Sequence, residues 1–371
     1  MHKTLAACTG FIKRETVLCA ALLLALVSVF LVPPDAAYAG YVDWDTLTLL
    51  FSLMAVMQGF SGGGLFVFLG ERLLIKTRTS SQMLFALVFL PFFFSTVITN
   101  DVALITFVPF GIAVLKMSGQ ERLAVPVIAL QTVAANMGSS LTPMGNPQNL
   151  YLYSKFSVGF SELILLMLPY VIVSGVCTAL LVLLRRSTPV VPPAPSGTAL
   201  SKKRCLISAA GFAVCLLALF DIIPPAAVAA FILVFLIAAD RRLLAKIDYS
   251  LLATFAAFFV FIGNIGRIEQ FRAFISSAIE GRVVPVSALA SQVVSNVPAA
   301  LLLSGFSDDW RGLIAGCNIG GLGTLIASMA SLISYKFLAK EFPEQRGRYL
   351  IYFTLCNIGL LALLLAVSFV L

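Results

Sequence analysis

Long apolar runs recur along the whole chain, separated by short polar segments. A helix needs roughly 20 apolar residues to cross the hydrocarbon core of a bilayer. Because lipid cannot hydrogen-bond an exposed backbone, such runs fold as helices. They occupy residues 16–32, 45–72, 83–117, 123–153, 161–184, 205–220, 225–239, 249–266, 284–304, 311–335 and 349–371. The sequence therefore predicts an all-α polytopic membrane protein.

The composition excludes the soluble alternatives. Only 11% of the residues are charged and 60% are hydrophobic, whereas a soluble domain is about 25% charged. The net charge of +8 is spread over the segments between apolar runs, so no basic patch predicts nucleic-acid binding. The seven cysteines include no Cys-x-x-Cys pair, and we expect no bound cofactor beyond a coupling ion. The lipid bilayer is the expected surrounding of most of this surface.

The first apolar run has two interpretations. Lys13 and Arg14 precede a short apolar core, and Ala37 to Ala39 resemble a cleavage site. Residues 1–42 are therefore either an N-terminal transmembrane segment or a signal peptide. Both interpretations place Asp43 outside the cell.

Lysines and arginines set the expected orientation. If the runs 83–117 and 284–304 are re-entrant hairpins, 20 of the 25 basic residues fall on one side of the membrane. Cytoplasmic loops carry such an excess of lysine and arginine. We therefore expect a multi-pass protein of the cell (inner) membrane, with the proline-rich loop 185–204 in the cytoplasm.

The chain contains an internal repeat. Residues 136–153 align without a gap with residues 318–335, and Asn136, Gly138, Thr142, Leu150 and Tyr153 have identical partners in the second segment. Earlier in each half, Asn100 corresponds to Asn296. The expected orientation brings Asp43 into its span from outside and Asp248 from inside. The repeats are therefore predicted to be inverted, which is typical of secondary transporters.

The repeat predicts four divisions of the chain. Residues 1–42 form the N-terminal segment, and residues 185–246 form a cytoplasmic linker with a connecting helix pair. Repeat 1 covers 43–184, with a hairpin tip at 99–101 and a broken helix over 123–153. Repeat 2 covers 247–371, with a hairpin tip at 295–298 and a broken helix over 311–335.

Polar, glycine-rich sequence interrupts the apolar runs at matched places in the two halves. Irregular backbone at membrane depth occurs only inside protein or beside a water-filled cavity. Freed carbonyl and amide oxygens suit a small cation, and the N-terminus of a following half-helix suits an anion. The candidate substrate-binding residues are Thr99, Asn100, Ser139, Gly145, Asn146, Pro147, Ser295, Asn296 and Thr324. The candidate cation-coupling residues are Asn100, Asp101, Asn136, Thr142, Asn296 and Asn318, with Na⁺ at Asp101, Asn100 and Asn136.

Asp101 is the only carboxylate inside the tight polar turns. Acidic residues within membrane segments are costly and mark ion pathways. Its side chain could bind Na⁺, carry H⁺ or cap the following helix, and its repeat partner is Val297. We expect it to couple transport to a cation.

Two segments of the first half resemble a known family. TNDVALITFVPF (99–110) and QTVAANMGSSLTPMGNPQNLYLY (131–153) are similar to the ion transporter superfamily of divalent-anion:Na⁺ symporters, citrate transporters, arsenite permeases and Na⁺/H⁺ antiporters. The resemblance covers residues from about 43 to 371. It implies a scaffold and a mobile transport domain, a homodimer and an elevator motion. In the symporters of this superfamily each hairpin tip reads Ser-Asn-Thr, whereas the tips here read Thr99-Asn100-Asp101 and Ser295-Asn296-Val297. The Asn-Asp pair of the first tip is closer to the arsenite-permease and antiporter branch.

Two other classes of function fit the sequence less well. Gly59 to Gly62 match the Gly-x-Ser-Gly pattern of membrane serine proteases, but the only histidine, His2, precedes the first span. No general base is available, so the chain is not expected to be an enzyme. Oxygen-rich hairpin tips also build channel filters, yet inverted internal symmetry favours a carrier. We therefore predict a secondary active transporter of a small anion, dicarboxylate- or citrate-like, coupled to Na⁺ or H⁺. An arsenite permease or a Na⁺/H⁺ antiporter is the alternative.

Overall fold

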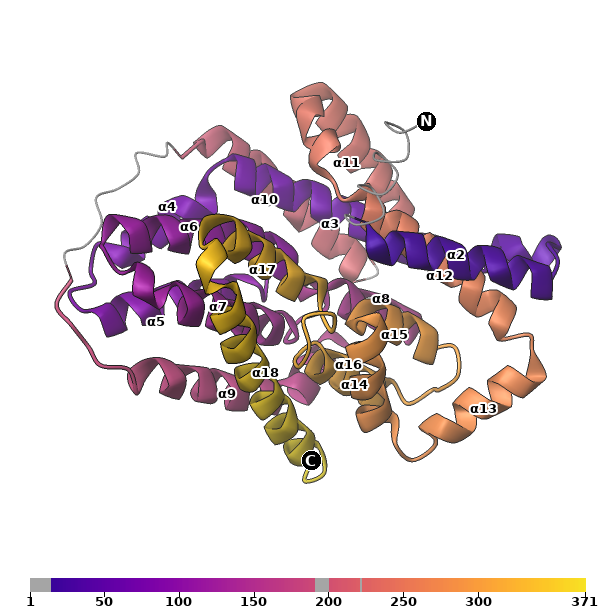
Figure 1. Ribbon diagram of the computed structural model, residues 1–371. Coiled ribbons are helices and arrows are strands. Elements are labelled where there is room, and N and C mark those ends of the chain that lie inside the picture. Colours follow the sequence, from indigo (N-terminus) through magenta and orange to yellow (C-terminus); the bar gives the residue numbers. More distant parts are fainter. Residues whose placement is uncertain (1–14, 191–199, 221) are drawn as a thin grey trace, which may run out of the picture. The chain divides into compact units, whose positions relative to one another are not determined.

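The computed structural model describes residues 15–190, 200–220 and 222–371, and helices joined by turns and loops make up these ranges (Figure 1). The only β-type contact in them is an isolated bridge between Thr79 and Pro189. The helices are α2 (Thr16–Leu31), α3 (Trp44–Gly62), α4 (Leu65–Leu74), α5 (Ser80–Phe94), α6 (Asn100–Met117), α7 (Ala124–Ser139), α8 (Pro147–Lys155), α9 (Phe160–Leu183), α10 (Lys202–Leu219), α11 (Pro225–Asp240), α12 (Tyr249–Ile265), α13 (Glu269–Ile279), α14 (Val283–Val294), α15 (Asn296–Leu303), α16 (Trp310–Gly320), α17 (Met329–Glu341) and α18 (Arg346–Ser368).

Several of these helices suit a membrane. Within the described residues α6, α9 and α18 are each long and apolar enough to cross a bilayer. Two further pairs pass the same test together but are bent, α3 with α4 by 54° and α12 with α13 by 105°. The predicted run 45–72 is thus divided near Gly64, which has φ +74° and so takes a conformation that favours glycine. The expected all-helical membrane architecture is confirmed.

The chain divides into two compact units. Unit 1 is drawn from Met1–Ala55, Val214–Arg282 and Leu301–Asp308. Unit 2 is drawn from Val56–Ala213, Val283–Ala300 and Asp309–Leu371. Both predicted hairpin tips and both predicted helix breaks therefore lie in unit 2.

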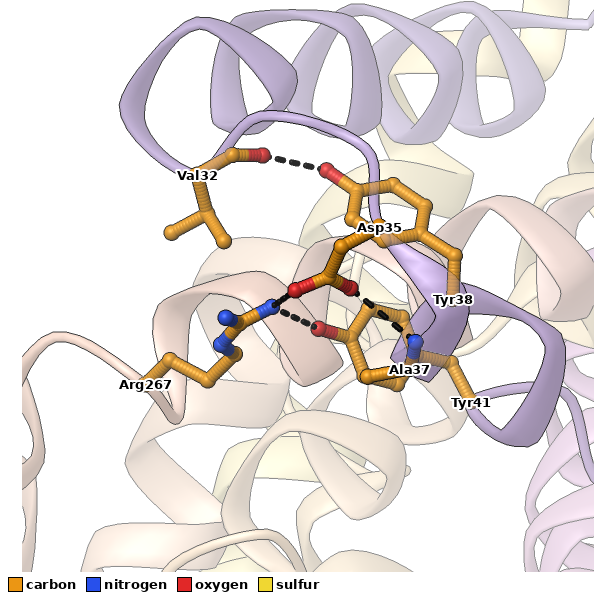
Figure 2. Close-up of polar contacts among 6 residues, drawn as sticks. All are labelled: Val32, Asp35, Ala37, Tyr38, Tyr41 and Arg267. Carbon is orange, nitrogen blue, oxygen red and sulfur yellow. Dashed lines mark hydrogen bonds and ion pairs between the residues drawn. The ribbon is translucent and has the colours of Figure 1, made fainter.

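Unit 1 is organised around the pairing of α2 with α12, which lie side by side (Figure 1). Asn264 Nδ2 donates a 2.9 Å hydrogen bond to Ser28 Oγ in this interface. A Cβ atom at Gly263 would lie 2.4 Å from Cγ of Tyr41, so glycine permits the close approach of the segment after α2. Figure 2 shows Arg267 reaching the same segment, with Nη1 2.8 Å from Asp35 Oδ2 and 3.1 Å from the Tyr41 hydroxyl. The residues after α2 are thereby held against the end of α12.

Unit 2 contains a helical hairpin formed by α5 and α6. The Gln131 side chain of α7 donates hydrogen bonds to the carbonyl oxygens of Leu87 in α5 (2.9 Å) and Phe107 in α6 (3.1 Å). Leu87 and Phe107 are equally far along the sequence from the connecting turn at residues 95–99. Because one side chain reaches both, α5 and α6 lie side by side and run antiparallel. Every residue of α7 is buried. The hairpin therefore packs directly on a central helix.

A second close packing in unit 2 joins α14 to α16. Gly312, Gly316 and Gly320 follow each other at four-residue spacing and so share one face of α16. A Cβ atom at each would come within 3.0 Å of α14 atoms, those of Val283, Val284 and Ala288 in turn. Glycine at these three positions lets the two backbones approach closely. This contact fixes where the turn between α14 and α15 lies along the axis of α16.

Candidate functional site

The first helix break lies between α7 and α8. After Ser139 the chain makes a short 3-10 turn, Pro143–Gly145, and α8 begins at Pro147. Asn146 caps α8, because its Oδ1 accepts a 2.9 Å hydrogen bond from the Asn149 N–H. Asparagine at the cap followed by proline at the first helical position is a favoured start of a helix. The sequence therefore specifies a new helix at this point rather than a continuation of α7.

Glycines allow this break to form in a crowded place. A Cβ atom at Gly138 would lie 2.0 Å from the Phe92 carbonyl oxygen of α5, and one at Gly145 would lie 2.1 Å from the Ser139 carbonyl oxygen. Both contacts are with backbone, which cannot move aside. Gly145, predicted to bind substrate, thus has a clear structural role in the break.

Three asparagines join the two halves of the chain at this break. Asn318, near the end of α16, accepts a 2.8 Å hydrogen bond at Oδ1 from Asn146 Nδ2. Asn318 Nδ2 donates in turn to Asn149 Oδ1 at 2.5 Å and to the Ile314 carbonyl oxygen at 2.7 Å. Asn146 Nδ2 also donates to Ser139 Oγ at 3.3 Å. All three asparagines are at most 2% exposed.

A second group is centred on Asn136 at the end of α7. Its Oδ1 accepts hydrogen bonds from Asn100 Nδ2 and from Ser328 Oγ, both at 3.1 Å. Its Nδ2 donates to the Gly321 carbonyl oxygen at 3.4 Å. Asn100 is the first residue of α6 and Ser328 is the N-cap position of α17. Asn136 therefore connects the first hairpin tip to the second helix break.

The second hairpin tip reaches the same break. The Asn296 backbone N–H donates to the Ala327 carbonyl oxygen at 2.9 Å, and a Cβ atom at Gly321 would lie 2.9 Å from Asn296 Nδ2. Ser295 has φ +76°, a left-handed conformation that is uncommon for a residue other than glycine. Such strain is typical of functional turns. The second tip therefore contacts the residues between α16 and α17 directly, whereas the first tip is connected to them through Asn136.

The other predicted residues surround this centre. The Asp101 N–H donates to Asn100 Oδ1 at 2.9 Å, and its side chain is half-buried in the first turn of α6. Thr99, also half-buried, precedes that turn, and Thr142 donates to the Thr96 carbonyl oxygen, which ties the break to the first tip. Thr324 is exposed, and its N–H donates to Gln292 Oε1 at 2.9 Å. It lies beside α14, and its side-chain hydrogen bond is to the Gln292 carbonyl oxygen rather than to one of the asparagines.

Uncharged groups dominate the buried polar side chains. Those in the described ranges are all Ser, Thr, Asn or Gln. No group of three or more His, Cys, Asp or Glu side chains is assembled in the described part of the chain. Amide oxygens of Asn100 and Asn136, with the Asp101 carboxylate next in sequence to Asn100, are the hard oxygen donors that suit Na⁺.

Four residues of the site were not predicted from sequence. They are Asn149, Gly321, Ser328 and the second-hairpin residue Gln292, whose Nε2 donates to the Gly320 and Leu322 carbonyl oxygens at 2.8 and 2.9 Å. The internal alignment contained a signal for two of them, because Gly321 is the repeat partner of the predicted residue Ser139. Ser328 is the repeat partner of Asn146, so it occupies the equivalent cap position in the second half.

An all-helical chain with several membrane-suited helices and a buried polar centre at two helix breaks is an integral membrane protein with the layout of a transporter. Comparison with known families agrees, since the family model described as citrate transporter matches residues 6–306. The chain belongs to this family, and the resemblance to the ion transporter superfamily is confirmed. Both assignments describe transporters and indicate no catalytic activity.

Individual relatives are also transporters or membrane proteins. An uncharacterized transporter of Methanocaldococcus jannaschii is 32% identical over 301 residues, covering 80% of this chain and 81% of the relative. An Escherichia coli inner membrane protein is 28% identical over 346 residues, covering 85% and 86%. A silicon efflux transporter of rice (Oryza sativa subsp. japonica) is 32% identical over 136 residues, which cover 36% of this chain and 27% of the relative.

Proposed function

We propose that this protein is a secondary active transporter that carries a small anion across the membrane together with Na⁺ or H⁺. The observation that carries the proposal is the buried asparagine centre, in which two helix breaks and two hairpin tips meet. Helix N-termini bind anions, because their free N–H groups and the helix dipole favour negative charge. Asn146 caps α8 with its side chain, whereas Ser328, the N-cap residue of α17, makes no side-chain cap hydrogen bond. We place the anion at these two N-termini, against the Asn100 and Asn296 tips.

The charge of the site favours an anion of low charge. Each helix N-terminus supplies about half a positive charge, and the buried polar side chains in the described ranges are uncharged. A citrate-like or dicarboxylate substrate would need a bound cation to balance its remaining negative charge. An arsenite permease or Na⁺/H⁺ antiporter is the alternative.

Transport by reconstituted protein tests the site. We expect Asn100→Ala, Asn146→Ala and Asn296→Ala each to reduce the initial rate of anion uptake into vesicles at least tenfold. Loss of the Asn146 cap costs about 0.5–2 kcal/mol, and Asn318 Oδ1, left without its donor, adds about 1–3 kcal/mol. A thermal melt therefore accompanies each variant and checks that the protein is folded. Saturable uptake with counterflow would identify a carrier, and ohmic flux a channel. Wild-type kinetics in all three variants would contradict this location of the site.

The packing of unit 2 supports inverted repeats. Gly138 approaches Ser95, and the repeat partner Gly320 approaches the equivalent Ser291, with Cβ distances to Oγ of 2.6 and 2.7 Å. Each broken helix also contacts the other repeat. Asn146, which caps α8 in repeat 1, bonds Asn318 of α16 in repeat 2, and Ser328, at the cap position of α17 in repeat 2, bonds Asn136 of α7 in repeat 1. Such reciprocal contacts are what a two-fold relation between the repeats produces.

Contacts at the helix ends support opposite directions for the two repeats. Lys116 at the end of α6 pairs at 2.7 Å with Glu341 at the end of α17, and α7 follows α6 after a short turn. The broken helix α7–α8 therefore starts at the end of unit 2 where α16–α17 finishes. α14 runs parallel to α16 along its glycines, so its hairpin enters from the other end.

Helix lengths favour re-entrant hairpins. At 1.5 Å per residue, α5 is about 22 Å long and α14 about 18 Å, both shorter than the hydrocarbon core of about 30 Å. The second arm of the first hairpin, α6, is long enough to span by itself, so it is the short first arm of each hairpin that favours re-entry. In our proposal unit 2, which holds both tips and both breaks, is the mobile transport domain of an elevator. Unit 1 is the scaffold and the contact of a homodimer, and α2 is retained as one of its membrane helices.

Labelling of single cysteines in a cysteine-free variant tests the sidedness. We expect cysteines at Lys76 and Lys116 to react with an impermeant maleimide only from the cytoplasm. Cysteines at Arg282 and Asp309 should react only from outside. The loop 185–204 supplies a cytoplasmic reference. Labelling of Lys76 and Lys116 from opposite faces would show that residues 83–117 cross the membrane and would contradict the hairpin.

A further inference from the structure

A groove opens on unit 2 between α9 and α18, two of the helices suited to cross the membrane. Its volume is about 480 Å³, within the range of about 300–1,000 Å³ typical of ligand sites. The floor is Leu130 and Val133 of α7, both at most 2% exposed. The walls are apolar side chains, including Leu181 of α9 and Leu355 and Leu363 of α18. The groove therefore offers an apolar ligand a surface that faces lipid.

The length of the groove matches one leaflet of a bilayer. Along α18 it runs from Tyr352 to Leu363, which at 1.5 Å per residue is about 16 Å. Half of a hydrocarbon core of about 30 Å is about 15 Å. An acyl chain in the groove would thus extend from the membrane surface to the midplane.

One end of the groove is basic. Arg185, just beyond α9, donates from Nη2 to the Tyr352 hydroxyl at 2.8 Å, and its guanidinium carbon lies 5.3 Å from the centre of that ring. Its Nε is buried without a hydrogen-bond partner among the described residues. Arg186 follows directly, and Arg348 lies one turn before Tyr352 on α18; both are exposed. Basic residues at the cytoplasmic ends of membrane helices attract anionic lipid head groups.

We propose that this groove binds one acyl chain of an anionic phospholipid, with its phosphate against Arg185. The apolar walls hold the chain, and the fixed guanidinium selects a negatively charged head group. The site is separate from the asparagine centre, and it stands whether or not the transported ion is an anion.

Gly359 provides a variant that fills the groove without disturbing the backbone. It lines the groove, and a Cβ atom there would meet nothing within 4 Å. Gly359→Phe should therefore occupy the space of the acyl chain. Ile351→Phe is the matched control, because Ile351 is 66% exposed on the same helix and lies outside the groove lining.

The test uses the full-length protein in phosphatidylcholine vesicles that contain a trace of phosphatidylglycerol with a photoactivatable acyl chain. We expect cross-links at Cys177, Cys356 and neighbouring groove residues, at least tenfold fewer in Gly359→Phe and unchanged in Ile351→Phe. The same chain on phosphatidylcholine should cross-link several-fold less, and Arg185→Gln should remove that preference.

Three outcomes would overturn the proposal. Cross-links spread evenly over the exposed face around Ile351 would indicate ordinary annular lipid. Groove cross-links that persist in Gly359→Phe would place the chain elsewhere. Cross-links between the α18 helices of two copies, blocked by Gly359→Phe, would show that a second protein copy fills the groove.

Discussion

Replacing Asp101 by Asn is expected to abolish anion accumulation driven by a cation gradient, while exchange of anion across the membrane persists. An ionised carboxylate half-buried in a membrane helix is costly unless a cation or proton compensates it. The amide keeps the shape and deletes the charge. Uptake into vesicles with imposed Na⁺ or pH gradients measures the effect, and we expect at least a tenfold loss of accumulation. The gradient that drives the wild-type protein identifies the coupling ion.

Asp45→Asn is the matched control for this change. Asp45 and Asp101 are both the second residue of their helices, α3 and α6, but Asp45 is exposed. A charge near a helix N-terminus contributes about 0.3–1 kcal/mol, so neither variant should unfold the protein. If Asp101→Asn accumulates substrate with wild-type cation dependence, the residue serves only the helix and the coupling assignment is wrong.

Asn318→Ala is expected to cause the largest loss of stability among single changes in the asparagine centre. The change removes the partner of Asn146 Nδ2 and of Asn149 Oδ1. Each of these two buried groups loses a hydrogen bond at a cost of about 1–3 kcal/mol, so we expect a loss of about 2–6 kcal/mol. Thermal unfolding in detergent should show the lower midpoint, and uptake should be lost because the two breaks no longer hold each other.

Asn357→Ala provides the comparison. Asn357 is fully buried in α18, but its only hydrogen bond among the described residues runs from Nδ2 to the Phe353 carbonyl oxygen one turn earlier. Its loss leaves no second side chain unpaired, so we expect a smaller fall in midpoint and preserved uptake. Equal losses of unfolding midpoint and of uptake in the two variants would show that the contacts of Asn318 across the breaks add nothing to stability or transport.

Local chemistry explains what could be predicted about the candidate site. The Asn-Pro pair at 146–147 starts α8 because the cap and the fixed φ of proline act within a few residues. The internal alignment pointed to Asn136 and Asn318, and both lie in the buried centre. Thr324, selected by the same alignment, is exposed. Equivalent positions in two repeats need not have equivalent surroundings, because the residues packed around them differ.

The start of α6 shows the limit of reasoning from residue type. The tip was predicted at residues 99–101, but Asn100 and Asp101 are already helical, and the turn occupies residues 95–99. The Ile98 N–H donates to the Phe94 carbonyl oxygen and extends the first arm into the turn. Polar residues indicate a turn, whereas hydrogen bonds between neighbouring turns decide its boundary.

By itself the sequence determined that this chain is a helical membrane protein of a transporter family, because apolar run length and local motifs act over short stretches of chain. Only the tertiary structure decided which partners meet: Asn146 with Asn318, Ser328 with Asn136, and the groove beside Arg185. An alignment pairs equivalent residues, but these contacts join non-equivalent residues of opposite halves. Their formation depends on how α7 and α16 pack with their neighbours, and that packing is a property of the whole unit.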